Sequence, residues 1–219
     1  MIAQIIKSVQ AEAALAVIDR TGFSLNSRSA YYSSITGKHK QFLQFNACIA
    51  GEHKLIATAK IRRKRRNEAI DFPALVRKAS RKLKIDVFLG DKVYNSEANH
   101  KLVRHELNSK LIAPLRRHCH KIKGFYRKQM AYLPSIYDKR VGICESSFSS
   151  LKRKFGDVIY AKKFVSQKNE LLCKVVTYNL DRIANLVIFE IYFLQSPLFL
   201  KILKSLFMPW KGLELREER

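Results

Sequence analysis

The chain has 219 residues, enough for one large domain or two small ones with a hydrophobic core. Its apolar fraction of 47% is that of a globular protein and argues against a largely disordered chain. Lys and Arg number 42 against 18 Asp and Glu, which gives a net charge of +24 and points to a polyanionic partner. Nucleic acid is the leading candidate, and an anionic membrane surface is the alternative.

The first half of the chain carries strand patterns. The apolar run ALAVID at 14–19 predicts a buried strand that ends on Asp19. Residues 42–61 alternate apolar and polar positions around a glycine-containing turn, which predicts a β-hairpin.

Helices and strands alternate after the hairpin. A helix is predicted at 71–83, followed by the strand IDVFLGD at 85–91, which ends on Asp91. Ser96 is expected to cap a second helix that runs to about 107, and KLIAPL at 110–115 predicts another strand. This order predicts an α/β fold whose mixed sheet is antiparallel at first and then parallel through helical crossovers.

The remaining chain is basic and then helical. Residues 115–135 are basic and irregular, and helices are predicted at about 138–155 and 167–186. The longest uncharged run of the apolar C-terminus, Ile191 to Leu200, falls short of the ~20 residues that a membrane span needs. We therefore expect a catalytic or binding domain at 1–186, an apolar helical tail at 187–219, and no membrane insertion.

The cysteines and the N-terminus carry no further signal. Four cysteines, at 48, 119, 144 and 173, form no C-x-x-C pair, so reduced thiols in a cytosolic protein are expected. The tripeptide HCH at 118–120 lacks a second ligand pair for zinc. The first residues show no signal-peptide pattern.

Three acids stand out by position. Asp19 and Asp91 each end an apolar strand, and such strand ends converge at the ligand-binding edge of an α/β sheet. Glu145 lies on a predicted helix that could cover this edge. Clustered carboxylates suit Mg²⁺, and a pair of ions can support an in-line displacement at phosphorus. The structural alternative is that the aspartates serve as turn or cap residues and Glu145 as half of a solvated i,i+4 pair.

The sequence motifs around these acids are more specific than the spacing between the acids. VIDRTGFS, FLGDKVYNSEANHKLV and YDKRVGICESSFSSLKRKFGD contain Asp19, Asp91 and Glu145 in that order. Over residues 13–185 the chain resembles the insertion-sequence transposases of the DDE class, which have an RNase H-like catalytic core. Their third motif is close to Y-x-x-R-x-x-x-E-x6-K, and here the corresponding residues are Tyr137, Arg140, Glu145 and Lys152.

The resemblance implies a role for each of these residues. Asp19, Asp91 and Glu145 would bind two Mg²⁺ (or Mn²⁺) ions, and Tyr137, Arg140 and Lys152 would contact DNA. Glu145 and Lys152 are seven residues apart, so on a helix they share a face about 10 Å apart. Arg140 precedes Glu145 by five residues instead of four, which turns it about 140° from the glutamate.

The resemblance also implies a function. The enzyme would hydrolyse phosphodiester bonds at the ends of a mobile element and transfer the 3′-OH into target DNA. It would act on double-stranded DNA as a homodimer, in the cytoplasm at the nucleoid, without a small-molecule cofactor. Only 18 residues precede Asp19, so we expect the chain to lack the N-terminal domain that recognises element ends.

Two further basic segments are expected to grip DNA phosphates. KIRRKRR at 60–66 has six basic residues in seven, and PLRRHCHKIKGFYRKQ interleaves cations with aromatic rings. The alternatives are a localisation signal or solvated turn for the first segment and a surface loop for the second. The residues assigned to DNA binding are Arg62, Arg63, Lys64, Arg65, Arg66, Arg116 and Arg117.

Two other functions stay open from the sequence. An inactive, truncated transposase remnant would bind DNA and oligomerise without cutting it. A nuclease with the same three acids would cut DNA without strand transfer. A membrane-surface protein ranks last, because it leaves the placement of the acids unexplained.

Overall fold

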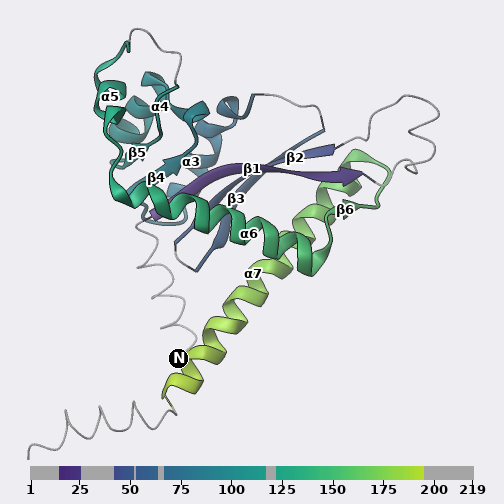
Figure 1. Cartoon of the computed structure of the whole chain (residues 1–219). Helices are drawn as coiled ribbons and strands as arrows, with labels where there is room; N and C mark the ends of the chain where they lie inside the picture. The colour runs from purple at the N-terminus through teal and green to yellow at the C-terminus, as the bar shows by residue number, and fades with distance from the viewer. Residues whose placement is uncertain (1–14, 26–41, 52, 64–66, 117–121, 195–219) are drawn as a thin grey trace, which may run out of the picture. The chain divides into compact units, whose positions relative to one another are not determined.

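The computed structural model of the chain describes five stretches of the sequence, drawn as coloured ribbon in Figure 1: 15–25, 42–51, 53–63, 67–116 and 122–194. The chain divides into two compact units, Met1–Arg182 and Ile183–Arg219. The first unit holds the sheet and the predicted site. Residues 195–219 of the predicted apolar tail lie outside the described residues, and the predicted domain boundary stays a prediction.

The first unit is built on one mixed sheet with strand order β3-β2-β1-β4-β5, and β6 pairs with β1 beside this path. β1 pairs antiparallel with β2 and β2 with β3, whereas β1 is parallel to β4 and to β6, and β4 to β5. The predicted antiparallel hairpin followed by parallel strands is therefore confirmed. The strands are β1 (Leu15–Leu25), β2 (Phe42–Ala50), β3 (Leu55–Arg62), β4 (Val87–Gly90), β5 (Lys110–Ile112) and β6 (Val158–Ile159).

The first strand is longer than the sequence predicts. The expected end at Asp19 is wrong, because β1 continues through Arg20, Thr21 and Gly22 to Leu25. Antiparallel pairing with β2 runs unbroken from Ala16 to Ser24 and satisfies the backbone of the small, polar segment. Asp19 thus lies in the middle of β1, paired with Ala47 of β2.

Helices cover both faces of the sheet, and each face has its own core. One core joins alternate β1 residues such as Ala16 and Ile18 to α3 (Phe72–Ser80) and to the π-helical turn η3 (Leu102–Glu106). The other core packs the opposite β1 residues, such as Val17, against α6 and α7. Figure 1 shows α6 lying across this second face.

The two long helices confirm their predicted positions. α6 (Lys139–Phe155) buries Ile143, Cys144, Ser147, Phe148 and Leu151, spaced as on one face of a helix. It runs unbroken through Gly142. α7 (Phe164–Leu194) begins earlier and ends later than the predicted 167–186.

The predicted helix at 97–107 is split. Ser96 caps α4 (Glu97–Lys101) by accepting a hydrogen bond from the Asn99 backbone N–H at 3.1 Å, and η3 continues from it. The shorter helical elements are η1 (Glu68–Ile70), η2 (Lys92–Tyr94), α5 (Phe125–Lys128), η4 (Gln129–Ala131) and η5 (Ser135–Asp138).

Polar side chains of α7 hold the edge of the sheet. The Asn179 amide donates to the Ile56 carbonyl and accepts from the Ile56 N–H, both at 3.0 Å. Tyr178 donates its hydroxyl to the Lys54 carbonyl at 2.9 Å. β3 is an edge strand, so these contacts satisfy backbone groups that no neighbouring strand of the described sheet pairs with. In the described part of the chain, no helix is long and apolar enough to cross a membrane.

Candidate active site

The register of the parallel strands brings Asp19 and Asp91 together. β1 and β4 pair from Leu15 opposite Val87 to Ile18 opposite Gly90, so Asp19 in β1 and Asp91, directly after β4, are the next residues in this register. Side chains alternate along a strand, and Asp19 follows Val17 onto the face that α6 covers. The predicted convergence of these two acids at one edge of the parallel pair is what the register produces.

A cation from α6 joins the two carboxylates. The Arg140 guanidinium nitrogen Nη2 lies 3.6 Å from Asp19 Oδ2 and 4.0 Å from Asp91 Oδ1. The Arg140 side chain is 15% exposed, Asp19 23% and Asp91 37%. The three groups therefore form a half-buried cluster in which one positive charge faces two negative ones.

Burial and the charge of Arg140 act in opposite directions on the pKa of Asp19. Burial raises the pKa of its carboxyl above the ordinary value, and the charge of Asp91 raises it further. Arg140, the Arg20 backbone N–H at 2.8 Å and the Cys144 thiol stabilise the ionised form. Asp91 is held differently, because it accepts from the Lys92 N–H at 2.7 Å and caps η2.

Cys144 belongs to the site although the sequence reading did not include it. It follows Arg140 by four residues, so both lie on the helix face that meets β1. Its buried thiol is hydrogen-bonded to Asp19, and burial raises the pKa of the thiol. A cysteine with so high a pKa is a poor nucleophile. The i,i+4 spacing from Arg140 was the available signal.

Glu145 is not brought to the aspartates. It lies one residue beyond Cys144, which turns its side chain about 100° around α6 and leaves it exposed. Among the described residues, no three His, Cys, Asp or Glu side chains are close enough to hold one metal ion together. The structure thus gathers two of the three predicted acids.

Tyr137 and Lys152 lie at different parts of α6 and its approach. Tyr137, in η5, is half-buried; burial raises the pKa of its hydroxyl, Arg140 lowers it, and the charges of Asp91 and Asp19 raise it. The Lys152 ammonium lies 5.4 Å from the centre of the Phe23 ring, and burial lowers its pKa. Lys152 therefore faces the far end of β1.

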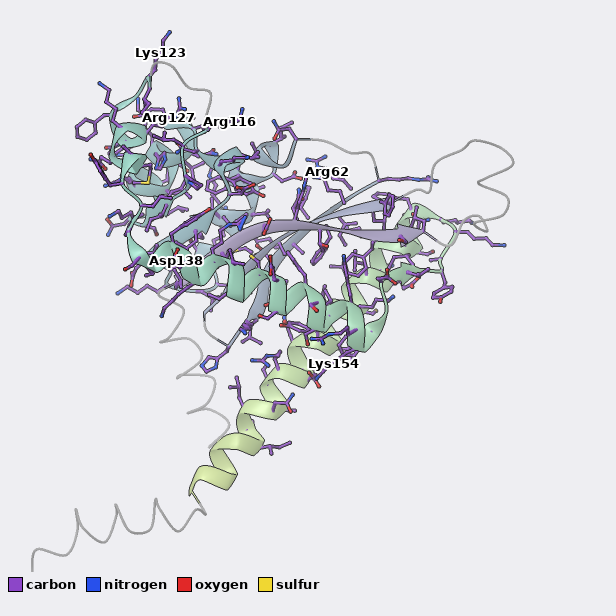
Figure 2. The ribbon with its side chains drawn as sticks, viewed as in Figure 1. Arg62, Arg116, Lys123, Arg127, Asp138 and Lys154 are labelled. Carbon is purple, nitrogen blue, oxygen red and sulfur yellow. The ribbon has the colours of Figure 1, made fainter. Side chains whose placement is uncertain are left out.

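The basic segment at 60–66 begins with an arginine that has a structural partner. Arg62 makes a double ion pair with the buried carboxylate of Asp71, which also accepts from the Asn46 amide at 2.7 Å. Arg63 is exposed. Figure 2 shows Arg62 with its side chain drawn. The other predicted DNA contacts of this segment, Lys64, Arg65 and Arg66, lie outside the described residues.

The second basic segment is only partly described. Arg116 follows β5 and is exposed (Figure 2). Arg117 and the HCH tripeptide lie outside the described residues. In the described part that follows, the Glu97 carboxylate accepts from the Tyr126 and Arg127 N–H groups at 3.3 and 3.2 Å. These bonds fix the start of α5 against α4.

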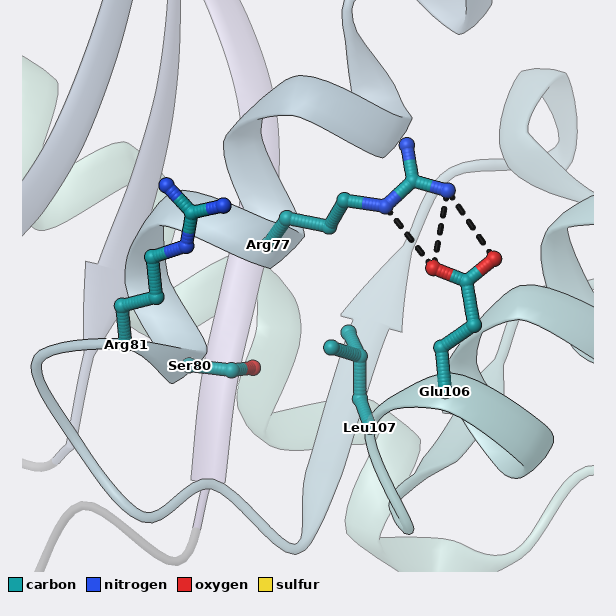
Figure 3. Close-up of a pocket in the computed structure, with 5 residues that line it drawn as sticks. All are labelled: Arg77, Ser80, Arg81, Glu106 and Leu107. Atoms are coloured by element: carbon teal, nitrogen blue, oxygen red, sulfur yellow. Dashed lines mark hydrogen bonds and ion pairs between the residues drawn. The ribbon is translucent and has the colours of Figure 1, made fainter.

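An open pocket of about 450 Å³ lies elsewhere, on the face covered by α3 and η3 (Figure 3). Arg77 in its wall makes two hydrogen bonds to Glu106, at 2.8 and 2.9 Å. The remaining lining residues are Ser80, Arg81 and Leu107. The pocket does not contain the acids of the site.

The arrangement of Asp19 and Asp91 fits a divalent cation. Two carboxylates, one in β1 and one directly after β4, already share one cationic group, and Mg²⁺ is bound in proteins by one or two carboxylates, waters and substrate phosphate. The exposed fraction of Asp91 leaves room for water and substrate. The mixed α/β sheet flanked by helices is an RNase H-like fold.

The sequence matches the Transposase DDE domain family over residues 11–180. The chain therefore belongs to this family, and the predicted resemblance to DDE transposases is confirmed. Domains of this family are metal-dependent. No curated protein matches the sequence.

Several solved structures are similar to the chain at low sequence identity. The piggyBac transposase synaptic complex with hairpin DNA is 9% identical with a TM-score of 0.50, covering 82% of this chain and 49% of that one. The catalytic core domain of BIV integrase is 11% identical (TM-score 0.42; 75% and 82% covered). The simian T-cell lymphotropic virus intasome in complex with PP2A regulatory subunit B56 gamma is 10% identical (TM-score 0.42; 73% and 47%). The piggyBac likeness agrees with the predicted RNase H-like fold, and the chain spans about half the length of two of these three proteins.

Proposed function

We propose that Asp19 and Asp91 form the catalytic centre of this transposase and act on phosphodiester bonds of double-stranded DNA. The observation that supports this most strongly is that both carboxylates lie within ion-pair distance of one cationic group. The reactions are hydrolysis at the element's ends and attack of the freed 3′-OH on target DNA. Each is an in-line displacement at phosphorus, with no covalent intermediate on the enzyme.

The cofactor of this centre is Mg²⁺ or Mn²⁺, with two ions in the active complex. Bound there, the ions stabilise charge on the attacking and leaving oxygens. Asp19 and Asp91 supply the inner pair of carboxylates. The exposed side chain of Glu145 is about 100° from the facing position, so it would supply the third carboxylate only if α6 moved against the sheet when DNA binds.

Basic residues around the centre hold the DNA backbone. The net charge of +24 favours a polyanion, since each neutralised phosphate releases counterions. Exposed Arg63 and Arg116 contact phosphates, and Tyr137, Arg140 and Lys152 position the strand near the acids. Lys64, Arg65, Arg66 and Arg117, which lie outside the described residues, are also proposed to contact DNA. The reaction involves two ends of the element, so we expect a homodimer with one subunit at each end. Because its substrate is DNA, we expect it to act at the nucleoid in the cytoplasm.

The test is Mg²⁺-dependent nicking of supercoiled plasmid DNA. Asp91→Asn should abolish nicking and leave DNA affinity unchanged, because the Asp91 side chain is 37% exposed and the substitution keeps its size. Asp86→Asn, an exposed aspartate outside the site, is the matched control and should nick like the native protein. Equal nicking by Asp91→Asn and the control would refute the proposal.

A second candidate, a DNA-binding remnant that does not cut, is favoured by one observation. Glu145 is exposed, and the position four residues after Arg140, where the family motif has its glutamate, holds Cys144. Gly142 lies on α6 with no atom within 4 Å of its Cβ position. Deleting Gly142 brings Glu145 to the four-residue spacing. Nicking by the deletion variant alone would identify the native chain as an inactive remnant; nicking by the native chain would exclude that function.

A further inference from the structure

The contact between Arg140 and the two aspartates is mainly electrostatic, because its distances are too long for good hydrogen bonds. Its Nη2 lies 3.6 and 4.0 Å from the two carboxylates, at the outer limit of an ion pair and beyond ordinary hydrogen-bond length. Its Nε is buried and has no hydrogen-bond partner among the described residues. A buried guanidinium usually satisfies most of its five N–H groups, so this position is a poor one for Arg140.

We propose that Arg140 is a built-in competitor of the divalent cation: it neutralises Asp19 and Asp91 in the free protein and must leave them for a metal ion to bind. This inference rests on the proposed function, because it concerns the same two carboxylates.

The competition follows from position and charge. The guanidinium nitrogen faces both carboxylates, and Mg²⁺ must come within about 2.1 Å of the same oxygens. A cation and a dication a few ångströms apart repel each other strongly in a half-buried site. The missing hydrogen bond at Nε reduces what Arg140 loses by leaving.

DNA offers Arg140 a better partner. A guanidinium binds phosphate through two parallel N–H bonds, which the present carboxylate contacts do not provide. Phosphate near the acids would therefore draw Arg140 away and open the cation site. Metal binding and DNA binding should then strengthen each other, and the free protein should bind metal weakly.

The experiment measures Mn²⁺ binding by electron paramagnetic resonance of the free ion, first without DNA. Arg140→Gln should tighten binding at least about tenfold, which corresponds to about 1.4 kcal/mol. Arg153→Gln removes the same charge from an exposed position on the same helix and should change the affinity less than about twofold, in keeping with screened surface charge. Arg140→Lys retains the charge and should bind Mn²⁺ more weakly than Arg140→Gln. If Arg140→Gln does not fold, Arg140→Met supplies a neutral side chain with an apolar stem.

A short DNA duplex is then added to each variant. It should tighten Mn²⁺ binding in the native protein and have much less effect in Arg140→Gln, where no competitor has to be removed. Unchanged or weaker Mn²⁺ binding by Arg140→Gln, or equal tightening by Arg153→Gln, would overturn the competition. Asp19→Asn distinguishes failure of the proposed metal site from failure of the competition by Arg140. If Mn²⁺ binding does not depend on Asp19, the proposed metal site itself is wrong.

Discussion

Arg62 and Arg63 are adjacent in the basic segment, yet changing each to Gln should affect a different property of the protein. Arg62 neutralises Asp71, whose side chain is 2% exposed, whereas Arg63 is exposed. Arg62→Gln should therefore lower stability, and Arg63→Gln should lower DNA affinity.

The size of the stability loss follows from the contacts. Removing one partner of a buried ion pair costs about 3–5 kcal/mol, because a charge is left without its counter-ion. Water reaches the 25% exposed Arg62 side chain, and the Asn46 hydrogen bond to Asp71 remains, so we expect the lower end, about 3 kcal/mol. At a slope of about 2 kcal/mol per M, the urea midpoint falls by about 1.5 M.

The pH dependence has a definite sign. Burial raises the pKa of Asp71, but the hydrogen bonds and charge of Arg62 outweigh this and hold it below the ordinary value of 3.8. The stability that the ion pair contributes is therefore complete above that value and lost as pH falls through the lower folded pKa. Arg62→Gln should remove much of this acid-dependent loss.

Two assays separate the arginines. Urea unfolding should show the loss for Arg62→Gln and a change within about 0.5 kcal/mol for Arg63→Gln. Fluorescence anisotropy with a DNA duplex at several salt concentrations should show the log–log salt slope reduced by about 0.9 for Arg63→Gln, the value for one phosphate contact. A loss below about 1 kcal/mol for Arg62→Gln would refute the reasoning, since that is the range of a surface ion pair.

Two further predictions concern the rest of the fold. Asn179→Ala leaves the Ile56 N–H and carbonyl without their side-chain partner, so it should lower the free energy of unfolding in urea by about 2 kcal/mol. Lys168→Ala, at an exposed position of the same helix, should leave it unchanged. Equal effects of the two substitutions would contradict the contact between Asn179 and the edge strand. Burial raises the pKa of Cys48 to about 12 and also raises that of Cys144, so among these three described cysteines iodoacetamide at pH 8 should label exposed Cys173 before Cys48 and Cys144. Peptide mass mapping checks this, and early labelling of Cys48 would contradict its burial.

The pairing of Asp19 with Asp91 could be predicted because it depends on local signals. Each acid follows a short apolar run, and the helix before the second run predicts a crossover that makes this run parallel to the sheet. The extension of β1 could not be predicted, because Thr21 and Gly22 suit a turn as well as a strand. Only pairing with β2, about 25 residues away, decides between them.

The orientation of α6 was only half predictable. The five-residue spacing shows that Arg140 and Glu145 face different directions, but not which of them faces the acids. Packing of Phe148 and Leu151 into the core sets the rotation of the helix and turns Arg140 and Cys144 inward. The Arg62–Asp71 ion pair is likewise a tertiary contact that no spacing rule indicates.

The central claim is that Asp19 and Asp91 jointly bind a divalent cation. Anomalous diffraction from crystals soaked in Mn²⁺ tests it most directly. We expect an anomalous-difference peak for Mn²⁺ at about 2.2 Å from one oxygen of each aspartate, with the Arg140 guanidinium moved away. A peak bonded to neither aspartate, or Arg140 still between the two carboxylates in a Mn²⁺-saturated crystal, would contradict it.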